Sequence, residues 1–133
     1  MTERWDVWPS ARLILVAERD GDVCGFASTE LGDVPLLDNL HVSPLLKRQG
    51  VGAVLLSATA HALAAQGARV LSLEVLAENA PSRSFYQKMG GEEGAEYSST
   101  LLGYPVRVAP FRWQEEAFTQ LAEQFAPLVG KGA

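Results

Sequence analysis

The sequence contains a single cysteine, Cys24, and therefore cannot form an internal disulfide bond. It also lacks a secretory signal segment and any run of ~18 apolar residues that could cross a membrane. Basic residues are in the minority, with 11 Lys and Arg against 16 Asp and Glu and a formal net charge of -5. Nonspecific nucleic-acid binding depends on clustered basic residues. These absences predict a cytoplasmic protein with neither a nucleic-acid nor a membrane partner.

The length and composition favour one domain spanning residues 1–133. Hydrophobic residues make up 47% of the chain, which is enough for a single core. No repeat divides the sequence, and Gly and Pro fall singly rather than in a linker.

Apolar periodicity predicts the elements of the first half. Residues 1–10 give no periodic signal and are expected to be irregular. The runs 13–17 and 23–27 predict a hairpin around the turn at 19–22, and 35–42 predicts a third strand. Apolar residues at helical spacing predict a helix over 50–66, with Gly67 as its left-handed cap.

The second half predicts a crossover followed by a second hairpin. A strand over 70–76 completes a βαβ unit, whose two strands are parallel and whose helix begins at the carboxyl edge of the first strand. The remaining elements are expected at 81–89 (helix), 92–102 and 106–113 (a hairpin), and 114–126 (an amphipathic helix). The fold class is therefore α/β (α+β).

A glycine-rich segment opens the helix of the crossover. The backbone N–H groups at a helix start lack intrahelical partners and attract anions, and glycine lets a diphosphate approach closely. Ordinary strand-to-helix packing is the alternative explanation. The segment has no Gly-Lys-Ser/Thr sequence for a Walker A loop and no third glycine for a dinucleotide fold. Its residues are Lys47, Arg48, Gln49, Gly50, Val51, Gly52 and Ala53.

A second motif, over residues 73–90, combines a strand, Asn79 and a helix containing Phe-Tyr-Gln-Lys-Met-Gly. Together with the glycine-rich segment it resembles the coenzyme-A motifs of the GCN5-related N-acetyltransferase (GNAT) family. The order of elements over residues 11–113 is similar as well. The resemblance implies a mixed, mostly antiparallel central sheet with flanking helices, and an acetyl-CoA-dependent N-acetyltransferase that uses no metal.

The resemblance also implies a set of coenzyme-binding residues. The glycine-rich segment would hold the diphosphate, although Lys47 departs from the Gln or Arg usual in the family. The pantetheine arm would lie between two splayed parallel strands and pair with backbone groups of the first. The residues implied beyond the glycine-rich segment are Leu40, His41, Val42, Asn79, Arg83 and Tyr86. Asn79 could alternatively be only a turn former or helix cap.

Three residues are candidates for catalysis. Tyr86 matches the family tyrosine that protonates the departing thiolate, and its alternative role is core packing. Glu74 is the first candidate for the general base, because alternation along its strand places it on the face opposite Leu71 and Leu73. Asp38 is the rival, on a face shared with Leu36, Leu40 and Val42 unless a β-bulge changes its orientation. Either carboxylate could instead be a hydrogen-bonded strand residue.

The sequence departs from the family at its N-terminal end. Family members usually place a strand and two helices before the first hairpin, whereas about ten residues precede it here. We therefore expect an open acceptor site that admits a large or peptide-like substrate, a site completed by a second subunit in a homodimer, or a truncated or partner-dependent subunit. The acceptor itself is expected to be a small-molecule amine or a peptide amine. A noncatalytic acyl-CoA-binding or regulatory module is the alternative to an enzyme.

Overall fold

The strands and helices follow the predicted order with two departures: a short strand is added at the N-terminus, and the one strand expected over 92–102 is divided into two. The computed structural model describes residues 4–5, 11–44, 50–101 and 103–125. The strands are β1 (Arg4–Trp5), β2 (Arg12–Arg19), β3 (Asp22–Glu30), β4 (Leu36–Val42), β5 (Val70–Leu76), β6 (Glu92–Glu93), β7 (Tyr97–Leu101) and β8 (Tyr104–Gln114). The helices are α1 (Val51–Ala65), α2 (Ala80–Lys88) and α3 (Glu115–Gln124). The short strand β1 corrects the expectation that residues 1–10 are irregular.

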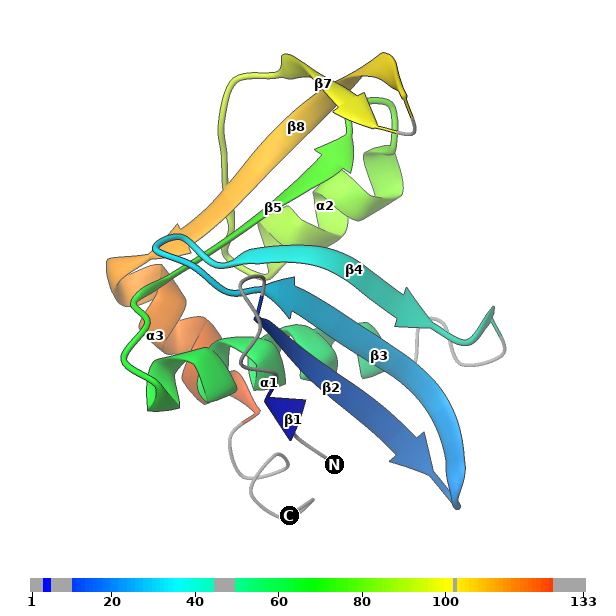
Figure 1. Ribbon diagram of the computed structural model, residues 1–133, viewed down its shortest axis with the longest axis vertical. Helices are drawn as coiled ribbons and strands as arrows, with labels where there is room; N and C mark the ends of the chain where they lie inside the picture. The colour runs from blue at the N-terminus through cyan, green and yellow to red at the C-terminus, as the bar shows by residue number, and fades with distance from the viewer. Residues whose placement is uncertain (1–3, 6–10, 45–49, 102, 126–133) are drawn as a thin grey trace.

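All described strands form one mixed sheet in the order β1-β2-β3-β4-β5-β8-β6, with β7 also paired to β8 (Figure 1). Only the β4–β5 pair is parallel within this sheet, so the predicted mostly antiparallel α/β architecture is confirmed. Asp20 and Gly21 both have positive φ, 54° and 85°, as a two-residue hairpin turn requires. Gly67 ends α1 with a φ of 92°, as predicted. No helix in the described ranges is long and apolar enough to cross a membrane.

The three helices pack on one face of the sheet. On this face a Leu55 methyl carbon from α1 lies 3.0 Å from the Cβ position of Gly25 in β3, and the Ser57 hydroxyl donates to the Leu121 carbonyl of α3 at 2.7 Å. Tyr86 of α2 packs on Phe111 of β8. The opposite face, hereafter the open face, carries Ser72 and Glu74 of β5 and has no helix among the described residues.

Strands β4 and β5 touch at one end and then separate. Their ladder consists of one pair, Leu36 with Ser72. There the Ser72 N–H and hydroxyl both donate to the Pro35 carbonyl, at 2.9 Å each. Beyond this point the two strands diverge toward their carboxyl ends (Figure 1). The separation predicted from the crossover and the family resemblance is confirmed.

A β-bulge at Asp38 changes the facing of β4. Ser28 pairs with Asn39 and Thr29 with Leu37, so Asp38 has no partner opposite it in β3. Asp38 lies on the open face, where it forms an ion pair with Arg12. Val42, by contrast, lies 3.7 Å from the Cβ position of Gly52 in α1. Of the two alternatives for Asp38, the β-bulge is confirmed, and Asp38 does not share a face with Val42 because the extra residue reverses the alternation beyond it.

Replacing Gly25 with alanine tests the contact between β3, β4 and α1. A Cβ at this buried position would lie 2.7 Å from the His41 carbonyl oxygen and 3.0 Å from Leu55. We expect Gly25→Ala to lower the free energy of unfolding by about 1–3 kcal/mol, as overpacking does. Gly32→Ala is the matched control, since nothing lies within 4 Å of its Cβ position. Equal urea-denaturation midpoints for the two variants would contradict this packing.

Candidate active site

The cleft between β4 and β5 presents unpaired backbone groups. Opposite residues of an antiparallel ladder alternate between hydrogen-bonded and non-hydrogen-bonded pairs. The Ser43 N–H donates to the Cys24 carbonyl at 2.8 Å, so Ser43 is in a hydrogen-bonded pair with β3. Alternation along the β3–β4 register then makes Val42 and Leu40 non-hydrogen-bonded positions, and their backbone N–H and C=O groups point away from β3 toward β5. His41 directs its backbone groups toward β3, and its ring lies 5.7 Å from that of Phe26. Leu40 and Val42 therefore offer one strand edge to an extended ligand.

The N-terminus of α1 closes the carboxyl end of this cleft. Gly50 precedes the helix with a φ of 82° and provides no side-chain cap, and the first described intrahelical bond runs from the Val54 N–H to the Gly50 carbonyl. The N–H groups of the first three helical residues therefore lack helical acceptors. The residues concerned are Val51, Gly52 and Ala53. The predicted Lys47, Arg48 and Gln49 lie outside the described residues.

Gly52 lies where the start of α1 meets two other elements. Its Cβ position lies 3.7 Å from both Val42 of β4 and Phe85 of α2. The helix start, the end of β4 and the aromatic face of α2 thus meet at one place. The unpaired amides and the positive end of the helix dipole make this corner suitable for an anion.

Tyr86 lies beneath the cleft in an aromatic cluster. Its ring centroid is 5.1 Å from Phe85, 5.7 Å from Phe111 and 6.0 Å from Trp113, and its side chain is 9% exposed. Burial raises the pKa of Tyr86 to about 12 because the phenolate would be poorly solvated. The phenol therefore stays protonated at neutral pH and can act as a proton donor.

The two carboxylate candidates have different surroundings. Glu74 is half-buried on the open face, where it lines a cavity of about 390 Å³ and has no hydrogen-bond or ion-pair partner among the described residues. Asp38 is exposed and its carboxylate lies 2.8 Å from the Arg12 guanidinium. Sequence reasoning missed Arg12, because the two residues meet across β3 only through the strand order and the bulge. Glu74 is thus the carboxylate available to take up a proton.

Asn79 and Arg83 both have partners within the chain. The Asn79 side chain caps α2 by accepting from the Ser82 N–H at 3.2 Å, which is the alternative considered for it. Arg83 donates to the Glu93 carboxylate at 2.7 Å and to the Ala77 carbonyl at 2.6 Å. These contacts join α2 to the end of β5 and to β6. Coenzyme contacts by Asn79 and Arg83 stay predictions.

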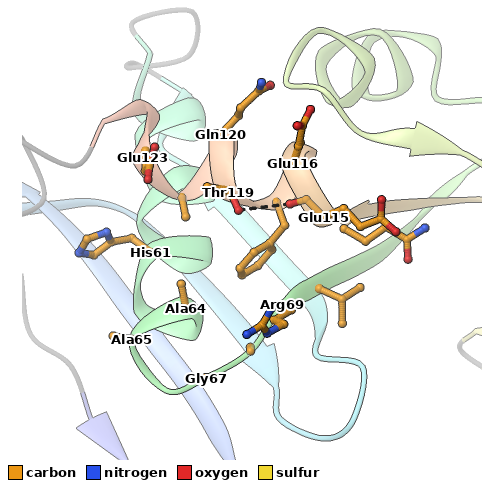
Figure 2. A pocket seen from close by; sticks show the side chains of 15 residues that line it. His61, Ala64, Ala65, Gly67, Arg69, Glu115, Glu116, Thr119, Gln120 and Glu123 are labelled. Carbon is orange, nitrogen blue, oxygen red and sulfur yellow. Dashed lines mark hydrogen bonds between the residues drawn. The ribbon is translucent and has the colours of Figure 1, made fainter.

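A larger cavity lies elsewhere in the structure. Its volume is about 1290 Å³, and it is formed by the C-terminal half of α1, the start of β5 and α3. Figure 2 shows His61, Arg69 and Glu115 around it. None of the predicted site residues lines this cavity, which lies at the end of α1 opposite Gly50. The region where β4 and β5 separate, which contains the predicted site residues, is therefore the candidate site.

Comparisons with known proteins identify the family of this chain. The model of the Acetyltransferase (GNAT) family matches residues 1–91. The uncharacterized N-acetyltransferase YhfO of Bacillus subtilis (strain 168) is 30% identical over 102 residues, covering 71% of this chain and 68% of that protein.

Solved structures of the same family share the fold. The ribosomal-protein-S18-alanine N-acetyltransferase of Escherichia coli superposes with a TM-score of 0.61 at 28% identity, covering 84% of this chain and 70% of that one. A GNAT family acetyltransferase of Elizabethkingia anophelis with acetyl-CoA bound gives a TM-score of 0.68 at 14% identity, covering 78% of this chain and 76% of that one.

The match to the family model and the curated relative define the class of protein. The chain belongs to the GNAT acetyltransferase family. It is an N-acetyltransferase, a class of enzyme that acetylates amines. No cluster of potential metal ligands occurs among the residues that the structure describes.

The buried phenol leads to a prediction about pH. We expect a difference titration between the native chain and Tyr86→Phe to show no phenolate absorbance from Tyr86 until the pH approaches about 12. Since its pKa is higher in the folded than in the unfolded state, the phenol contributes stability that is present below pH ~10 and is lost as the pH rises toward the folded value. Circular dichroism at each pH identifies any coincident unfolding. Ionisation near pH ~10 in the folded protein would contradict the burial of Tyr86.

Proposed function

We propose that the chain transfers an acetyl group from acetyl-CoA to a primary amine by direct attack within a ternary complex. The observation that carries this proposal is the separation of β4 and β5 beyond the single Leu36–Ser72 pair. That separation leaves the backbone of Leu40 and Val42 open and leads to the start of α1. Tyr86 and Glu74 flank the same region from opposite faces of the sheet.

The residues of the cleft suit the parts of coenzyme A. The pantetheine arm carries amides that can pair with the free edge of β4 at Leu40 and Val42, as an added strand would. The diphosphate suits the amides of Val51, Gly52 and Ala53, with Lys47, Arg48 and Gln49 as further predicted contacts. His41, Asn79 and Arg83 complete the predicted set. A fold-level likeness to a structure with acetyl-CoA bound supports this assignment.

Two side chains handle the protons of the reaction. Acetyl-CoA supplies the thioester, whose carbonyl carbon forms a bond to the amine nitrogen as the carbon–sulfur bond breaks. Glu74 accepts the proton that the amine loses, and the Tyr86 phenol donates a proton to the sulfur of the departing coenzyme. Exchange with water then restores both groups. The products are the amide and free coenzyme A.

The surroundings of the carboxylates favour Glu74 over Asp38 as the base. Arg12 already forms an ion pair with Asp38 through both carboxylate oxygens, whereas Glu74 faces a cavity and has no partner among the residues that the structure describes. A noncatalytic acyl-CoA-binding module, the alternative from the sequence, would need neither Glu74 in a cavity nor a buried phenol. A cytoplasmic homodimer stays a prediction, and light scattering after size exclusion decides the oligomeric state.

The Tyr86→Phe variant tests the proposed acid. Acetyl-CoA should saturate the native chain in calorimetry at neutral pH, and Tyr86→Phe should bind it with nearly the same Kd. The kcat for coenzyme A release in the presence of pooled amines should fall about 10²-fold, within the range of general acid catalysis. Absence of coenzyme binding by the native chain would overturn the proposed function. An unchanged kcat would remove only Tyr86 from it.

The two carboxylates are separated by their pH-rate profiles. Glu74→Gln should abolish the acidic limb of kcat/KM and lower the rate by about 10²–10⁴-fold, because no group then accepts the amine proton. Asp38→Asn should retain that limb and lose only the exposed ion pair with Arg12, worth about 0–1 kcal/mol of stability. The reverse pattern would identify Asp38 as the base.

A further inference from the structure

The open face carries a cavity sized for a small molecule beside Glu74. Its volume of about 390 Å³ falls in the usual range for small-ligand sites, about 300–1,000 Å³. Strands β5 and β8 form its floor, and Leu36 and the segment from Glu92 to Tyr97 form its walls. The Gly94 N–H holds this segment against β8 by donating to the Pro110 carbonyl at 2.9 Å. The cavity is therefore made of strands and a tethered segment.

Arg112 supplies a cation without a partner in this cavity. It lies between Ser72 on β5 and Glu92 on β6 in the sheet register, and its side chain is exposed. No ion pair or hydrogen bond joins its guanidinium to another described residue, not even to Glu92. Other arginines near the site are engaged, Arg12 by Asp38 and Arg83 by Glu93. Arg112 is thus available for an anionic group of a ligand.

Glu74 and Arg112 lie on one face at diagonal positions of neighbouring strands. Glu74 pairs with Pro110, two residues before Arg112 on β8. Such diagonal neighbours are about 7–8 Å apart at the backbone, and the longer arginine side chain can shorten the gap between the charged ends. An amine near Glu74 and an anion near Arg112 would then belong to one small molecule, with the two groups separated by a few bonds.

We propose that the acceptor is a primary amine with a carboxylate close to its amino group, as in a free amino acid, and that Arg112 binds this carboxylate. The inference rests on the proposed function. The planar guanidinium matches a carboxylate with two parallel hydrogen bonds. Leu36, Tyr97 and Pro110 provide apolar surface for the side chain of the amino acid. Arg112 is then a specificity-determining residue, and it takes no part in the proton transfers.

The test compares free amino acids with their α-carboxamides, which keep the amine and lose the negative charge. Coenzyme A release is followed with a thiol reagent, and kcat/KM is measured for each pair. We expect the free acids to be preferred by at least about tenfold. Arg112→Gln should reduce this preference at least about tenfold through a higher KM for the acids, and Arg112→Lys should recover part of it. Arg69→Gln, at the far cavity of Figure 2, is the matched control and should keep the preference.

Each outcome assigns the result to one of the two proposals. Equal use of acids and carboxamides, or transfer only to polyamines or peptide amines, would overturn the carboxylate site and leave the proposed acetyltransferase function intact. An unchanged preference in a folded Arg112→Gln variant would do the same. Acetyl-CoA binding without release for any amine would overturn both proposals.

Discussion

The arrangement of the site depends on the single point of contact between two parallel strands. Ser72 donates both its N–H and its hydroxyl to the Pro35 carbonyl, and this contact fixes the start of β5 against β4. From there the strands separate, so β4 keeps one edge without a neighbouring strand. A fully paired sheet would satisfy these backbone groups internally and leave no place for an extended ligand. The site exists because the pairing stops after one residue pair.

The candidate site residues lie on both faces of the sheet. On the helix face, burial among aromatic rings keeps Tyr86 protonated and therefore able to donate. On the open face, Glu74 and Arg112 line a cavity that the described helices leave uncovered. The proposed proton donor and the proposed proton acceptor thus lie in different environments, and we propose that the reacting group binds between them.

Much of this arrangement could be predicted from local pattern. The crossover, the turn at Asp20 and Gly21 and the cap at Gly67 follow from period and residue type, since each depends on neighbours in the chain. The orientation of Asp38 could not be predicted, because its bulge arises from the register with β3. The Arg12–Asp38 ion pair joins two strands that are not adjacent in the sheet, so it could not be predicted from local pattern. The lack of an ion-pair partner for Arg112 among the described residues could not be predicted either, because it depends on the positions of all the neighbouring charges. Alternation along β5 correctly predicted that Glu74 and Leu73 lie on opposite faces of the sheet, because that strand has no bulge.

The bulge at Asp38 also determines where the chain tolerates changes in length. Beyond the bulge, strand alternation directs the backbone groups of Leu40 and Val42 toward the cleft, while the backbone of His41 bonds to β3. Deleting the extra residue would only join Leu37 to Asn39 opposite the consecutive residues Thr29 and Ser28, which keeps the pairing on both sides. A deletion beyond Leu40 would instead exchange these roles and turn the side chains that follow to the other face, since strand periodicity is two. The exposed hairpin tip at Asp20 and Gly21 carries no such constraint. Insertions and deletions among relatives should therefore gather at that tip or at the bulge and be absent from the part of β4 beyond Leu40.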